Sequence, residues 1–227
     1  MSLSIVACAP QQDSNAEGNQ SGRVAESADS SQQFTPEVMW QMGRIGAYHL
    51  SADAQKAVYG VTYYSVEQNK SRSVIYASTP NSDAEPTLLT TNGSEYAPSF
   101  IPGSDKVAFL ASANDGSGTM QLWMMNADGT GRQQISFEAN GVDDYLFSPC
   151  GKKVVLVETV SHEASVQKND DDLSKSTGIV ANDLMYKHWD HYTKSAPHPF
   201  IASFDGNKVS EGEDLLEGTP YESPMLP

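Results

Sequence analysis

Basic charge, cysteine and long apolar runs are all scarce in this sequence. Lys and Arg number 14 against 29 Asp and Glu, so the 227 residues carry a formal net charge of −15. Binding to the phosphate backbone needs a basic surface that releases counterions, so we expect no nucleic-acid partner. The longest apolar run falls far short of the roughly 18–20 residues of a membrane-spanning helix. Two cysteines do not define a disulfide framework.

Hydrophobic residues are also sparse, at 38%, whereas Gly and Pro number 17 and 12. This profile suits a turn-rich β protein with a polar tail better than a helical bundle. Residues 9–33 contain one Val and no aromatic or larger aliphatic residue, so they cannot bury enough apolar surface to offset the entropy of ordering. We expect residues 1–33 to form a disordered, flexible tether and residues 34–227 to form the folded domain.

The tether follows Ile5-Val6-Ala7-Cys8, which resembles the lipobox of bacterial lipoproteins. In those proteins the Cys is acylated after the signal peptide is removed. The resemblance implies lipid attachment at Cys8, a place in the bacterial cell envelope (periplasmic or lipid-anchored), and membrane contact only through that lipid. The departure is that only seven residues precede Cys8, without a basic segment or a full apolar core, so the signal peptide is interpreted as truncated.

Three segments of the chain repeat one pattern, in which an apolar anchor is followed by a turn with Pro, Gly or Asp, then Lys and an apolar strand. The anchors are Leu50, Phe100 and Phe147, which lie about 50 residues apart. That period falls in the range of ~40–50 residues typical of a four-stranded propeller blade. β-branched and aromatic runs separated by Gly turns predict strands near 57–64, 73–77, 107–111, 121–125, 133–135, 154–160 and 199–207. The sequence therefore predicts an all-β fold, a partial β-propeller of about three four-stranded blades.

Two segments depart from the strand pattern. A short helix is predicted at 36–43, with Thr35 as N-cap, Pro36 in the first turn and Gly43 closing it. The third repeat is interrupted, so residues at about 161–198 are interpreted as an insertion within a blade, and such insertions often map to the binding face. Cys150 is interpreted as a small turn residue and not a nucleophile. Trp40 and Trp123 are interpreted as core or blade-packing residues and are assigned no site.

A family resemblance rests on two of these segments. Residues 34–46 (FTPEVMWQMGRIG) resemble the lead-in to the propeller of bacterial dipeptidyl aminopeptidases and acylaminoacyl peptidases, which belong to the prolyl oligopeptidase family of serine peptidases. Residues 184–190 (LMYKHWD) resemble the Tyr-…-Trp-Asp segment of the same enzymes, and residues 200–206 resemble the strand after it. The blade turns match the family's Ser-Pro-Asp-Gly only imperfectly. The resemblance covers about residues 34–227 and implies the N-terminal propeller portion of such a peptidase.

The chemistry of that family lies in another domain. Its Ser nucleophile stands in a Gly-x-Ser-x-Gly elbow of an α/β-hydrolase domain, followed by Asp and His. The present sequence has no Gly-x-Ser-x-Gly, and Gly116-Ser117-Gly118 has the wrong spacing. We therefore expect no catalytic residues and no peptidase activity in this chain alone, and a parent protein that is a serine peptidase. The missing hydrolase domain is then its partner, and the length reflects a truncation, since closed propellers need 4–8 blades.

The resemblance also implies where a peptide substrate binds. Asp190 would pair with the ammonium of the peptide amino terminus, Trp189 or Tyr186 would line the pocket, and His188 lies in the same segment. The alternatives are an aromatic loop that packs on its own blade, or a metal site at His188 and His191. A zinc site needs a further ligand that nothing in the sequence supplies, so we expect no metal and no cofactor. Asn169-Asp170-Asp171-Asp172 is interpreted as a solvated loop.

Two functions are compatible with these observations. The first is the propeller part of an exported serine peptidase, which gates access to the catalytic site and helps to bind peptide substrates. The second is a non-catalytic propeller of the cell envelope that recognises protein partners. The two differ in whether a hydrolase domain accompanies this chain.

Overall fold

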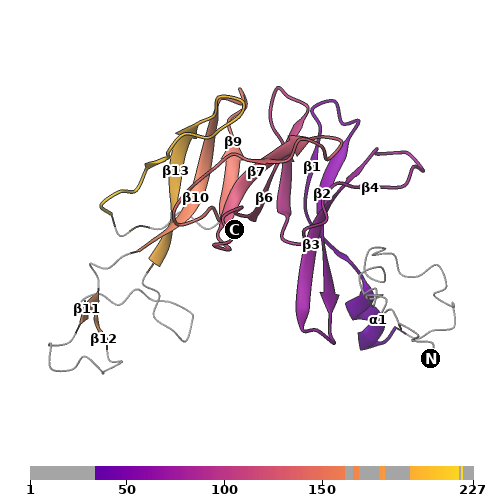
Figure 1. Cartoon of the computed structure of the whole chain (residues 1–227), viewed down its shortest axis with the longest axis horizontal. Helices are drawn as coiled ribbons and strands as arrows, with labels where there is room; N and C mark the ends of the chain where they lie inside the picture. The colour runs from indigo at the N-terminus through magenta and orange to yellow at the C-terminus, as the bar shows by residue number, and fades with distance from the viewer. Residues whose placement is uncertain (1–33, 162–165, 169–178, 182–194, 220, 222–227) are drawn as a thin grey trace, which may run out of the picture.

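A computed structural model describes residues 34–161, 166–168, 179–181, 195–219 and 221 of the chain. Within these residues, one short helix precedes three antiparallel four-stranded sheets, in each of which the spatial order of the strands follows the chain. The sheets stand side by side in the order of the sequence (Figure 1). The expected propeller blades are therefore confirmed, and we name them blades 1, 2 and 3.

The strands of each blade have the following bounds. Blade 1 comprises β1 (Arg44–Leu50), β2 (Ala57–Ser65), β3 (Lys70–Ser78) and β4 (Thr87–Leu88). Blade 2 comprises β5 (Tyr96–Phe100), β6 (Lys106–Ser112), β7 (Met120–Asn126) and β8 (Gln133–Gln134). Blade 3 comprises β9 (Asp144–Phe147), β10 (Lys153–Ser161), β13 (Ser195–Ser203) and β14 (Glu213–Asp214). A separate pair, β11 (Val166–Lys168) and β12 (Ile179–Ala181), lies between β10 and β13 in the sequence.

The turn after each anchor is built in the same way in all three blades. The backbone N–H of the residue after the anchor donates to a Lys carbonyl five residues later, at 2.8 Å from Ser51, 2.9 Å from Ile101 and 2.8 Å from Ser148. Gly151 takes a positive φ of 67° in the third turn, and a Cβ there would lie 2.3 Å from the carbonyl oxygen of Pro102. Glycine thus allows the turn of blade 3 to rest on that of blade 2.

Apolar side chains fill both junctions between blades. The first core lies between blades 1 and 2 and includes Val58, Ile75, Phe109 and Trp123. A larger core between blades 2 and 3 includes the following buried residues: Leu110, Leu122, Met124, Phe147, Val154 and Leu156. These rows alternate along their strands with residues of the opposite face, as the side-chain period of a strand requires.

The anchor of blade 1 differs from the other two. Phe100 and Phe147 are buried, whereas Leu50 is 46% exposed. Leu50 has the same register as the other anchors, since each anchor pairs with the residue after the Lys of its turn. Phe100 and Phe147 face the preceding blade, whereas Leu50 lies on the face of blade 1 turned away from blade 2, against which no described blade packs. Blade 1 therefore presents exposed apolar side chains on its outer face.

The predicted helix is present as α1 (Pro36–Gln41), with Thr35 as N-cap and Pro36 in its first turn. Its predicted end is wrong, because Met42 is the C-cap in an extended conformation and Gly43 does not adopt a left-handed one. Gly43 serves a close approach instead: a Cβ there would lie 2.5 Å from Cε1 of Tyr63. The lead-in therefore packs tightly against blade 1.

The residues at which the third blade is interrupted are well defined. β10 continues to Ser161 and β13 begins at Ser195, and these two residues pair with each other. The strand thus begins slightly before the expected end of the insertion at about 198. The expected tether at 1–33 lies outside the described residues. Among the residues that the structure does describe, no helix is long and apolar enough to cross a membrane.

Candidate functional site

The residues predicted to bind peptide lie outside the described part of the chain. They are Tyr186, His188, Trp189 and Asp190, and the same holds for Cys8, the predicted lipid attachment site. Their segment leaves blade 3 after Ser161 and returns at Ser195. The strands of blade 3 that flank this segment are β10 and β13, and they contribute to a cluster of titratable groups.

Glu158 is the centre of this cluster. On β10, Val154 and Leu156 face blade 2 within the apolar core, and Glu158 continues the same row by the two-residue period of a strand. Its side chain is almost completely buried, with the residue only 3% exposed. A carboxyl group thus occupies a position that the pattern of the strand assigns to an apolar side chain.

The surroundings of Glu158 favour its neutral form. Within the described part of the chain, its Oε1 atom is buried without a hydrogen-bond partner. Burial, and then the negative charges of Glu138, Asp143 and Asp214, raise the pKa of Glu158 to about 7. An uncompensated buried carboxylate is costly, so this group holds a proton at mildly acidic pH.

His198 lies opposite Glu158 on the neighbouring strand. The two residues are register partners in the β10–β13 pair, and His198 is also buried, at 2% exposure. Its Nδ1 lies 2.8 Å from Oδ2 of Asp214 on β14, the distance of a hydrogen bond in which the ring N–H donates to the carboxylate. Blade 3 therefore brings Glu158, His198 and Asp214 together from three adjacent strands.

Glu138 and Asp143 approach from the connection between blades 2 and 3. Gln121, which is buried on β7, fixes Glu138 through both backbone groups: its Oε1 accepts from the Glu138 N–H at 3.0 Å and its Nε2 donates to the Glu138 carbonyl at 2.6 Å. The backbone N–H of Asp143 donates to the carbonyl of Val157 at 2.8 Å. Burial, together with the negative charge of Glu211, raises the pKa of Glu138.

We call Glu138, Asp143, Glu158, His198 and Asp214 the acidic junction. It can hold a proton or attract a cationic group, and none of its five residues is a Ser, Thr, Cys or Lys. In the part of the chain that the structure describes, no group of His, Cys, Asp and Glu is arranged to hold a metal ion. Sequence reasoning missed Glu158, although a charged residue in the row Val154, Leu156, Glu158 was the signal that could have indicated it.

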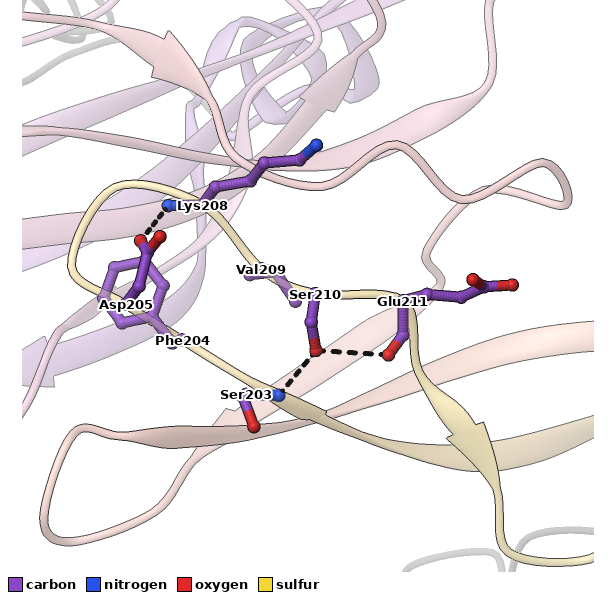
Figure 2. A pocket seen from close by; sticks show the side chains of 7 residues that line it. All are labelled: Ser203, Phe204, Asp205, Lys208, Val209, Ser210 and Glu211. Carbon is purple, nitrogen blue, oxygen red and sulfur yellow. Dashed lines mark hydrogen bonds between the residues drawn. The ribbon is translucent and has the colours of Figure 1, made fainter.

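A hollow lies in the loop between β13 and β14 of blade 3 (Figure 2). It has a volume of about 280 Å³ and is lined by residues 203–205 and 208–211. Oδ1 of Asp205 accepts from the backbone N–H groups of Asn207 and Lys208, and Oγ of Ser210 accepts from that of Ser203. These polar groups maintain the loop itself, so the hollow follows from the turn.

Cys150 stands in the exposed turn between β9 and β10. Its Sγ lies 3.4 Å from Oγ of Ser148, and this hydrogen bond lowers the pKa of the thiol. The structure thus places it in a turn, as the sequence predicted.

Curated relatives cover nearly all of this chain. Dipeptidyl-peptidase 5 of Porphyromonas endodontalis is 34% identical over 214 residues, which make up 93% of this chain and 30% of that protein. Dipeptidyl-peptidase 5 of Porphyromonas gingivalis is 35% identical over 199 residues, or 88% of this chain and 29% of that protein. The chain thus spans less than a third of the length of these relatives. No family model matches it.

Solved structures support the same fold. The acylaminoacyl peptidase of Pyrococcus horikoshii, in an orthorhombic crystal form, superposes with a TM-score of 0.57 over 81% of this chain and 27% of that one, at 13% identity. An acylaminoacyl peptidase in complex with Z-Gly-Gly-Phe-chloromethyl ketone gives a TM-score of 0.56 over 78% and 26%, at 14% identity. These likenesses concern the fold alone. Together with the curated relatives they confirm the resemblance that the lead-in and the interrupted blade indicated.

Proposed function

We propose that this chain, which corresponds to the N-terminal propeller portion of proteins of the dipeptidyl-peptidase and acylaminoacyl-peptidase type, gates and helps to bind the peptide substrates of an exported serine peptidase. Catalysis would take place in an α/β-hydrolase domain encoded beyond residue 227. The observation that carries the proposal is the 34% identity with a dipeptidyl-peptidase over 93% of this chain. The three blades agree with it, because the acylaminoacyl peptidases share their fold.

The proposal assigns substrate contact to the segment between β10 and β13. Tyr186, His188, Trp189 and Asp190 supply aromatic surface and a carboxylate, which suit the amino terminus of a peptide. At the base of the segment the acidic junction adds further carboxyl groups. The net charge of −15 also attracts a cationic peptide end.

Export and lipid anchoring are part of the same proposal. They rest on Cys8 with its preceding aliphatic residues and on the polar composition of residues 9–33. Replacing Cys8 with Ser in the protein with its natural leader should abolish incorporation of labelled palmitate. Incorporation that persists in this variant would contradict lipid attachment at Cys8.

The first test of the peptidase assignment is the gene. A Gly-x-Ser-x-Gly followed by Asp and His within a few hundred codons after residue 227 supports it. A natural gene without that elbow contradicts it and favours the non-catalytic module that recognises protein partners. The present chain alone should hydrolyse no dipeptidyl substrate, and activity of this chain would contradict the separate location of catalysis.

The second test separates binding from catalysis in the complete protein. Asp190→Asn should raise KM for dipeptidyl substrates about tenfold and change kcat little, since it removes a charge contact to the bound amino terminus. Asp172→Asn is the matched control from the same segment, and its kinetics should equal those of the wild type. Equal kinetics of the Asp190 variant and this control would contradict substrate contact by Asp190.

A further inference from the structure

The junction between blades 2 and 3 contains a buried carboxyl group on which no Lys or Arg of the described residues acts. Among these residues the Oε1 atom of Glu158 has no hydrogen-bond partner, and Glu158 is only 3% exposed. Three further carboxyl groups act on it: Glu138 from the connection between the blades, Asp143 from the residue before β9, and Asp214 from β14. Each of them opposes a negative charge on Glu158.

The neighbouring groups have partners of their own. Oδ2 of Asp143 accepts a hydrogen bond from Oγ1 of Thr159 at 2.7 Å. Asp214 is engaged by His198, the register partner of Glu158, and Gln121 on the side of blade 2 is uncharged. Among the described residues, every charged group that acts on Glu158 raises its pKa, and none of them is a Lys or Arg.

We infer that the contact between blades 2 and 3 is sensitive to a proton: it is tight while the Glu158 carboxyl is protonated and weakens when this group ionises. Ionisation places a further negative charge beside Glu138, Asp143 and Asp214, on a residue that is only 3% exposed. The contact affected first is the backbone link to blade 2 next to Asp143, where the N–H of Val142 donates to the carbonyl of Met120 on β7 at 2.8 Å. The inference rests on the geometry of the junction and does not depend on the proposed function.

Hydrogen exchange of the 227-residue chain tests this directly. The amide of Val142 should be followed at pH 5.5 and pH 8.5, with correction for the intrinsic exchange rate, so that protection reports the opening equilibrium. A carboxyl that titrates near 4.5 when exposed and near 7 in the junction implies an opening constant about 30-fold larger at pH 8.5. The amides of β2 in blade 1 serve as the internal reference and should show no such change.

Two substitutions and one control complete the experiment. Glu158→Gln and Glu158→Met remove the ionisable proton, so each should abolish the pH dependence at Val142. Glu67→Gln makes the same chemical change on the exposed β2–β3 hairpin and should retain the dependence. The inference is overturned if the wild-type opening constant is equal at the two pH values, if β2 changes as much as Val142, or if either Glu158 variant keeps the dependence.

Discussion

Each of the two junctions between blades contains a buried glutamate, and the charged groups around the two glutamates are opposite in sign. Glu95, at the junction of blades 1 and 2, accepts from the backbone N–H groups of Gly93 and Ser94 and from the guanidinium of Arg132. Glu158, at the junction of blades 2 and 3, has an unpaired oxygen and acidic neighbours. The comparison shows that a buried glutamate can stabilise one contact between blades, and that in the next contact its effect on stability depends on protonation.

The position of Arg132 explains how the junction of blades 1 and 2 is stabilised. Its guanidinium lies 4.6 Å from the ring centre of Trp123 and 5.3 Å from that of Phe109, within the apolar core. The aromatic rings and Glu95 fix it together, so the charge of the fully buried Glu95 is compensated by a guanidinium that is itself largely covered.

The largest expected effect comes from breaking this pair. Arg132→Met should destabilise the chain by about 2–4 kcal/mol, because Glu95 is then left buried without a counter-charge. Urea denaturation at pH 7 measures the loss. The double variant Glu95→Gln, Arg132→Met is the control and should regain part of it. A loss below about 1 kcal/mol would show that the two junctions do not differ in this way.

The second effect is the pH dependence of stability caused by Glu158. Its pKa is raised in the fold, so the folded state holds the proton more tightly than the unfolded state. The contribution of Glu158 to the free energy of unfolding should therefore be greatest below about pH 4.5. It should fall by about 1–3 kcal/mol as the pH rises to 7. Denaturation midpoints from pH 4.5 to 8 should show this decline in the wild type and in Glu67→Gln, and a flatter profile in Glu158→Gln. If the denaturation midpoints of all three proteins changed with pH in parallel, Glu158 would not be the cause of the pH dependence.

A third effect concerns a hydroxyl that ties blade 3 to blade 2. Oη of Tyr145 donates at 2.6 Å to the carbonyl of Ala97 and lies 2.8 Å from that of Ala108 and 3.0 Å from Oγ of Ser99. Tyr145→Phe should cost about 1–2 kcal/mol, because buried polar atoms lose their partner. Chemical denaturation compares this variant with Tyr48→Phe, whose hydroxyl lies on an exposed side chain and whose loss should be negligible. Equal stabilities would mean that the junction does not depend on this hydroxyl.

The fold could be predicted from the sequence because its signals are local. The anchors Phe100 and Phe147, each followed by a tight turn, recur at the spacing of a blade, and every blade forms from consecutive residues. The prediction that Gly43 closes the helix was wrong, since the role of Gly43 depends on Tyr63, which lies on β2. Glu158 was missed for a similar reason, because its neighbours Glu138 and Asp214 are distant in the sequence.

The smallest expected effect concerns backbone strain in the turn between β1 and β2 of blade 1. Ala54 has a φ of 56° in the turn of blade 1, where the corresponding residue of blade 3 is Gly151. Ala54→Gly should stabilise the chain by about 0.5–1 kcal/mol, because it relieves the strain of a left-handed alanine. Ala52→Gly, in the same turn but without a positive φ, should be neutral or destabilising in the same thermal melt. Destabilisation by Ala54→Gly would show that the turn is not strained.

The titration of the Glu158 carboxyl tests the contrast between the two junctions most directly. Carbon-detected NMR of the 227-residue chain, with the resonance assigned from the loss of signal in Glu158→Gln, follows this group from pH 3 to 9. The account predicts a midpoint near pH 7. A midpoint below pH 5 would mean that the group is ionised in the junction at neutral pH without penalty, and would contradict the account.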